Sequence, residues 1–222
     1  MTNNFRPRLA TLLLIILSSG GAAYRVWASA EHPLCRFATH EEQVELEEQQ
    51  LLADLAESTA KAADEIFSLV EGLWEHNAIE RLAYLGFKHD RDIARLELER
   101  QGRLLERQTS VVEQYRLQCA AFAAGTSTGD QRRTIEAAYL EYSRADCAAL
   151  EVEVEIGKVD TAFRVEMLES VRDLRAGDVA TRQDVIVAIR DLEMARKRLD
   201  SATLRTEACR RKTAPAVVPP RS

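Results

Sequence analysis

A heptad run between residues 135 and 163 constrains the fold of this chain more than any other feature. Intervals of three and four residues alternate along it without a miss, at Ile135, Ala138, Tyr142, Ala145, Ala149, Val152, Ile156, Val159 and Phe163. Such spacing places apolar side chains along one edge of an α-helix, and that edge must be buried against another helix. A second stripe, formed by Leu140, Cys147, Leu150 and Val154, predicts contact with more than one neighbour. The run therefore predicts a helical bundle.

Three further segments have helical spacing of apolar residues. The first runs from Glu41 to Glu75, with apolar positions at Leu51, Leu55, Ala62, Ile66, Leu69 and Leu73. The second runs from Ile79 to Cys119, with an alternative break at Gly86. The last repeats a seam at Val185, Ala188, Leu192, Ala195, Leu199 and Ala202. Only nine glycines and five prolines interrupt 222 residues, which leaves few turns. We predict an all-α fold in which long antiparallel coiled-coil hairpins form an elongated up-down helical bundle.

The boundaries between these segments follow from local turn chemistry. Residues 31–123 form a first helical hairpin that turns at 74–77, and 124–130 is a loop with two glycines. Residues 131–211 form a second hairpin, and 212–222, with three prolines, a disordered tail. In the second turn we expect Gly177 to adopt the left-handed conformation and Thr181 to cap the next helix.

The N-terminal thirty residues have the pattern of an export signal. Arg6 and Arg8 precede an uncharged stretch of 16 residues from 9 to 24, and Ala28-Ser29-Ala30 supplies a cleavage site. We expect residues 1–30 to be cleaved, with an uncleaved N-terminal anchor as the alternative. Twenty-five arginines against five lysines indicate a bacterial source, and the periplasm is the expected location. The processed chain would carry 27 basic and 36 acidic residues, formally −9, which argues against nucleic-acid binding.

The four cysteines lie in the exported part, where disulfides form. Residues that face each other across an antiparallel hairpin lie equally far from its turn. Cys147 and Cys209 have their midpoint at 178, and Cys35 and Cys119 have theirs at 77, so each pair is centred on a predicted turn. We predict these two disulfides. The alternative pairs Cys119 with Cys147 and Cys35 with Cys209.

The sequence offers little catalytic chemistry. It contains no nucleophile signature, no phosphate-binding glycine loop and no dinucleotide fingerprint. None of the four histidines (His32, His40, His76 and His89) has zinc-ligand spacing, and His89 falls on an apolar stripe, as an interface histidine would. A metal site at 89–92 with glutamate partners is the competing hypothesis. We therefore expect no enzyme activity, no catalytic residue and no cofactor.

One segment, Glu169 to Leu199, resembles the α-helical hairpins of two envelope families, the periplasmic adaptor (membrane fusion) proteins and the TolC-type outer-membrane efflux proteins. Over about 40 residues the chain shows the basic-Leu-x-x-Gly turn, the hydroxyl restart and the acidic-apolar pair of these hairpins, at Arg172, Leu174, Gly177, Thr181, Asp184 and Val185. The resemblance implies a tip that docks onto another helical hairpin, with Arg172, Leu174 and Thr181 at the contact. The chain has no alternating strand pattern for the β-domains of these families, so it is not a complete member of either.

These observations predict a non-enzymatic periplasmic interaction or scaffold protein, an accessory of an efflux or secretion assembly. Its expected partner is another envelope protein bound through helical hairpin contacts, and self-association is compatible with the seams. Membrane contact is expected only if the N-terminal segment is retained. The alternatives are a periplasmic chaperone, a stress-sensing or metal-sensing helical bundle, and an exported coiled-coil protein whose turn merely uses common capping residues.

Overall fold

The computed structural model describes residues 33–123 and 129–213, and all of its regular structure in these ranges is helical. Four helices follow one another: α3 (Pro33–Glu75), α4 (Arg81–Ala123), α5 (Gly129–Ala176) and α6 (Arg182–Thr213). The predicted all-α bundle of long hairpins is confirmed. The predicted export signal at 1–30, most of the central loop and most of the C-terminal tail lie outside the described residues.

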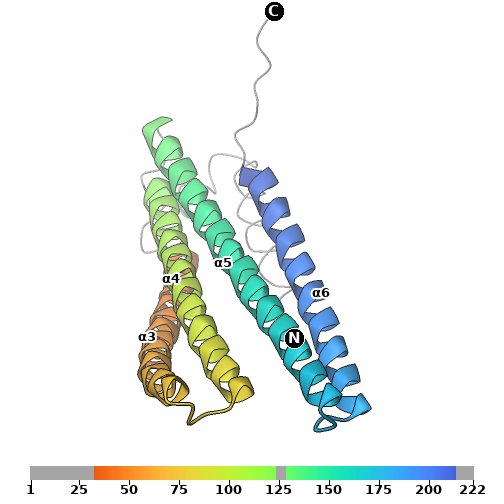
Figure 1. Ribbon diagram of the computed structural model, residues 1–222. Coiled ribbons are helices and arrows are strands. Elements are labelled where there is room, and N and C mark those ends of the chain that lie inside the picture. The colour runs from red at the N-terminus through yellow and green to blue at the C-terminus, as the bar shows by residue number, and fades with distance from the viewer. Residues whose placement is uncertain (1–32, 124–128, 214–222) are drawn as a thin grey trace, which may run out of the picture.

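The helices are arranged as a row in chain order (Figure 1). Each packs on the next, α3 on α4, α4 on α5 and α5 on α6. Consecutive helices run antiparallel, so the turns of both hairpins lie at the same end of the bundle, the lower end in Figure 1. Helices α4 and α5 therefore have neighbours on two sides, as the two stripes of the 135–163 run predict, whereas α3 and α6 form the edges.

The core is thin and rich in alanine. None of the described side chains falls below 2 % exposure, and the buried apolar residues include Ala56, Ala60, Ala149, Ala195 and Ala202. Small side chains let helix axes approach closely, and Gly157 of α5 marks such an approach because a Cβ there would lie 3.2 Å from Cα of Leu199 in α6. The seams predicted for α5 and α6 face the interior, with none of their members exposed.

Some predicted boundaries were wrong. Helix α3 begins at Pro33 instead of residue 41, since the glutamate-rich segment continues the helix. Helix α4 runs through Gly86 without a break because a single glycine inside 43 helical residues costs only about 1 kcal/mol. Helix α6 extends to Thr213, beyond the predicted end at 211.

The stripe predicted for the first helix is also on the wrong side. Leu51, Leu55, Ile66, Leu69 and Leu73 are all exposed. The face of α3 that meets α4 is the adjacent one, with buried residues at Ala56, Ala60, Phe67 and Val70. Burial of this face is reinforced by Arg91, whose guanidinium carbon lies 3.9 Å from the centre of the Phe67 ring.

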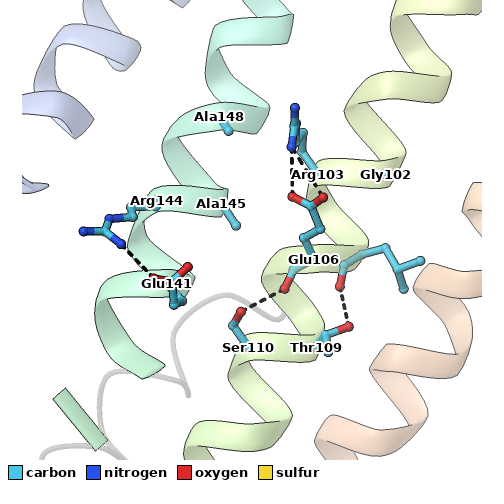
Figure 2. Close-up of a pocket in the computed structure, with 10 residues that line it drawn as sticks. Gly102, Arg103, Glu106, Thr109, Ser110, Glu141, Arg144, Ala145 and Ala148 are labelled. Atoms are coloured by element: carbon cyan, nitrogen blue, oxygen red, sulfur yellow. Dashed lines mark hydrogen bonds and ion pairs between the residues drawn. The ribbon is translucent and has the colours of Figure 1, made fainter. Parts of the chain in front are cut away.

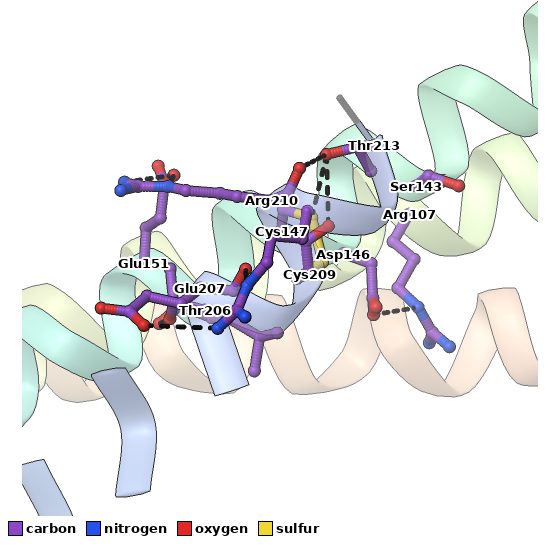
Figure 3. The surroundings of a disulfide bond; sticks show 12 residues. Arg107, Ser143, Asp146, Cys147, Glu151, Thr206, Glu207, Cys209, Arg210 and Thr213 are labelled. Atoms are coloured by element: carbon purple, nitrogen blue, oxygen red, sulfur yellow. Dashed lines mark hydrogen bonds and ion pairs between the residues drawn. A yellow bond between two sulfur atoms is a disulfide. The ribbon is translucent and has the colours of Figure 1, made fainter. Parts of the chain in front are cut away.

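Both hairpins are closed by a disulfide at the end opposite the turn. Cys35 pairs with Cys119, with Cα atoms 5.9 Å apart, and Cys147 pairs with Cys209, with Cα atoms 5.6 Å apart. These are the pairs expected from the midpoints. Around the second disulfide, Thr213 donates hydrogen bonds to carbonyl oxygens of the last turn of α6, and Arg210 forms a 2.7 Å ion pair with Glu151 (Figure 3). Two disulfides fit an oxidising, exported location.

Candidate interaction surfaces

The two hairpin turns use the same helix-ending motif. At the second turn, the Val179 amide donates to the Leu174 carbonyl (2.9 Å) and the Asp178 amide to the Arg175 carbonyl (3.1 Å). At the first turn, the Ala78 amide donates to Leu73 (2.8 Å) and the Asn77 amide to Trp74 (2.9 Å). Each pair of bonds is a Schellman motif, which requires a left-handed residue. The left-handed residues are Asp178 (φ 58°) and Asn77 (φ 56°).

The prediction that Gly177 takes the left-handed conformation was therefore wrong by one residue. Asp and Asn tolerate this conformation better than other non-glycine residues because their short polar side chains bond locally. The Asp178 carboxylate lies 3.7 Å from the Arg175 guanidinium. Arg175 also donates to the carbonyl of Ala180, so one side chain joins two parts of the turn.

The restart of α6 is a capping box. The Thr181 amide and hydroxyl both donate to the Asp184 carboxylate (2.8 and 2.7 Å), and the Asp184 amide donates back to the Thr181 hydroxyl (3.2 Å). The hydroxyl bond, and then the amide bond, hold the pKa of Asp184 below the usual aspartate range. The turn is thus fixed from both sides, and Thr181 does cap the helix as predicted.

Most residues predicted for partner binding build this turn. Leu174 supplies a capping carbonyl, Thr181 and Asp184 form the capping box, and Gly177 lies inside the cap. Val185 and the Leu174 side chain are partly buried, whereas Arg172 is exposed. The structure thus brings the six residues together at one tip.

Two apolar residues that the sequence analysis did not single out are displayed at this tip. Val179 is 74 % exposed and Ile186 is 57 % exposed. Just behind the tip, a groove of about 220 Å³ opens between α5 and α6, lined by Met167, Val171, Val187 and Ala188 together with Arg164, Asp184 and Asp191. Val179 follows the left-handed Asp178 in the Schellman motif, a position that is often apolar, so its exposure had no signal in the sequence.

The faces of α4 and α5 that meet are joined by a ladder of charges with heptad spacing. Asp146 and Glu153 of α5 lie seven residues apart and bind Arg107 (2.9 Å) and Arg100 (3.4 Å) of α4. One heptad further on, Asp160 lies 3.5 Å from the Nε2 atom of His89. These contacts favour the observed register of α4 against α5, because a shift would separate the two arginine pairs and the His89 contact.

Two of these acids also bind α6. Glu153 lies 2.7 Å from Arg205, and Asp160 lies 3.9 Å from Arg198. The acids border a groove of about 500 Å³ that α4, α5 and α6 share. Arginines from two helices neutralise Glu153, so the charges at this groove connect the helices and leave little to attract a charged ligand.

A groove of about 690 Å³ lies between α4 and α5 (Figure 2). Its charged residues pair within their own helices, Arg103 with Glu106 and Arg144 with Glu141, and Gly102, Ala145 and Ala148 contribute small surfaces. Open walls with satisfied charges give little to orient a small substrate.

His89 lies between α4 and α5, as predicted for an interface histidine. Its ring stacks on Phe163 with centroids 4.1 Å apart. Within residues 33–123 and 129–213, no group of three or more His, Cys, Asp or Glu side chains is arranged to hold a metal ion. In the same ranges, no helix has the length and apolar character needed to cross a membrane.

Comparisons of this chain with protein-family models, with curated proteins and with solved structures find no match.

Proposed function

We propose that this chain is a non-enzymatic interaction protein of the bacterial periplasm that binds another helical envelope protein through the α5–α6 tip. The observation that carries the proposal is the display of Val179 and Ile186 on a turn fixed by a Schellman motif and a capping box. Exposed apolar side chains on a preorganised turn favour protein contact, because little conformational entropy is lost on binding.

The environment of the tip supports a helical partner. The groove behind Val179 and Ile186 lies between two antiparallel helices and is lined by four apolar residues, two acids and an arginine. A side chain projecting from another helical hairpin would fit such a groove as a knob fits a hole. Together with the resemblance of 169–199 to adaptor and TolC-type hairpins, this geometry leads us to propose a role as an accessory of an efflux or secretion assembly.

The proposal is tested by site-specific photo-crosslinking in cells that produce the full chain. A photoreactive residue at 179 should give a covalent adduct with an outer-membrane channel or its adaptor. The matched control is position 204 on α6, where Leu204 is 64 % exposed and far along the helix from the tip. Adding Ile186→Asp should remove the adduct without changing helix content by circular dichroism. Equal adducts at 179 and 204, or none at 179, would contradict the proposed tip contact.

A further inference from the structure

Helix α3 carries a second heptad seam beside the face that packs on α4. Its members alternate at three and four residues and are all exposed: Leu52, Leu55, Thr59, Ala62, Ile66, Leu69 and Leu73. A seam of this kind is the contact surface of a coiled coil. Among the described elements the main packing partner of α3 is α4, which it meets through its adjacent face. We propose that a second copy of this chain binds here, with the two α3 helices antiparallel.

The order of side-chain sizes along the seam supports an identical, antiparallel partner. Leucines at 52 and 55 are followed by the small residues Thr59 and Ala62, and then by Ile66 and Leu69. The sequence of sizes is the same read in either direction. In the antiparallel register that pairs Thr59 with Ala62 of the second copy, Leu55 meets Ile66 and Leu52 meets Leu69. A two-fold interface requires this self-complementarity.

The residues that border the seam agree with the same register. Along the solvent side they are Leu51, Ser58, Glu65 and Gly72. Glu65 then falls opposite Ser58 of the second copy, so no like charges meet, and Leu51 falls opposite Gly72, which leaves room for it. The other side of the seam is the face that packs on α4, about 100° further round the helix, so α4 does not obstruct a partner.

The apolar area is sufficient for association. Six aliphatic side chains, Leu51, Leu52, Leu55, Ile66, Leu69 and Leu73, are between 42 % and 73 % exposed. In the proposed register Leu73 falls opposite Glu48 of the second copy. The other five present roughly 500 Å² per copy, so a pair would cover about 1,000 Å² in total, the size that a specific interface must reach. This seam is separate from the α5–α6 tip, so the inference does not rest on the proposed function.

The first test measures the mass of the purified full chain in solution by light scattering after size exclusion. We expect twice the mass of one chain. Leu55→Glu combined with Leu69→Glu should give the mass of one chain with unchanged helix content. The control is Leu204→Glu, since Leu204 is as exposed as Leu55 (64 % and 63 %) but lies on α6, and it should leave the dimer intact. A wild-type chain of single mass would overturn the proposal and assign the seam to a different protein, as would a dimer unaffected by the double substitution.

The second test determines the direction of the pair. All four native cysteines are in disulfides, so an introduced cysteine is the only free thiol. A mixture of Thr59→Cys and Ala62→Cys chains should cross-link on mild oxidation much faster than either chain alone. Rapid cross-linking of Thr59→Cys with itself would indicate parallel helices and overturn the antiparallel arrangement.

Discussion

Helices α3 and α6 form the two edges of the row, yet they divide their side chains differently between neighbour and solvent. In α6 the predicted seam packs against α5, with Leu192, Ala195 and Ala202 buried, and much of the outer face is charged. In α3 alanines and Phe67 pack against α4, and the leucines face outward. The difference teaches that a strong apolar stripe on an edge helix need not face the neighbour in its own chain.

The largest expected effect compares the two edge stripes directly. Leu192→Ala should lower the free energy of unfolding by about 2–5 kcal/mol, because Leu192 is 7 % exposed and its removal leaves a cavity. Leu69→Ala should cost less than about 0.5 kcal/mol in the single chain, because Leu69 is 73 % exposed. Urea unfolding followed by circular dichroism, at a concentration where copies do not associate, measures both. Equal losses would contradict the assignment of the α3 stripe to solvent.

The next effect concerns a feature that the hairpins share. Replacing both cysteines of one disulfide by serine should cost about 2–4 kcal/mol, because the unfolded chain gains freedom. The loops closed by the two disulfides span 84 and 62 residues, and the entropy term changes only with the logarithm of loop length. We therefore expect similar losses for Cys35/Cys119 and Cys147/Cys209, with helix content retained in both variants. Loss of stability in one variant only would show that the hairpins are held differently.

The smallest expected loss of stability concerns the second turn, where Thr181 and Asp184 form a capping box. Thr181→Ala should cost about 1 kcal/mol. It should also raise the pKa of Asp184 toward the ordinary aspartate range, because the hydroxyl bond is lost while the bond from the amide of residue 181 remains. Because the folded pKa is lowered, this bond stabilises the fold above the ordinary aspartate pKa, and the contribution is lost as pH falls through the folded value. Carboxyl titration by NMR measures the pKa of Asp184. An unaltered pKa in Thr181→Ala would exclude the hydroxyl bond as the cause of the lowered value.

The helical fold was predictable because heptad spacing is local information, and the disulfides followed from turn positions that are also local. The face of α3 was not predictable in this way. Its leucines form a clear stripe, but a pattern shifted by about one residue gives a second stripe at Ala56, Ala60, Phe67 and Val70. Only the packing of α4 decides which of the two stripes is buried. The charge ladder of Asp146, Glu153 and Asp160 was missed because acids seven residues apart also occur on solvated faces.

At the tip, several of the residues predicted for partner binding form the hydrogen bonds of the turn. Capping residues have a recognisable sequence pattern because backbone geometry demands them. Val179 and Ile186 have no such pattern, since their exposure depends on how α5 and α6 meet.

The disulfides also determine how the protein carries mechanical load. A pull applied to the two ends of the chain passes from Cys35 directly to Cys119, and from Cys147 directly to Cys209, through sulfur atoms. Both turns and most of each hairpin lie outside that path. Between Cys35 and Cys209, stretching would therefore draw out only the segment from Cys119 to Cys147, while the tip and the leucine seam of α3 keep their shape under tension.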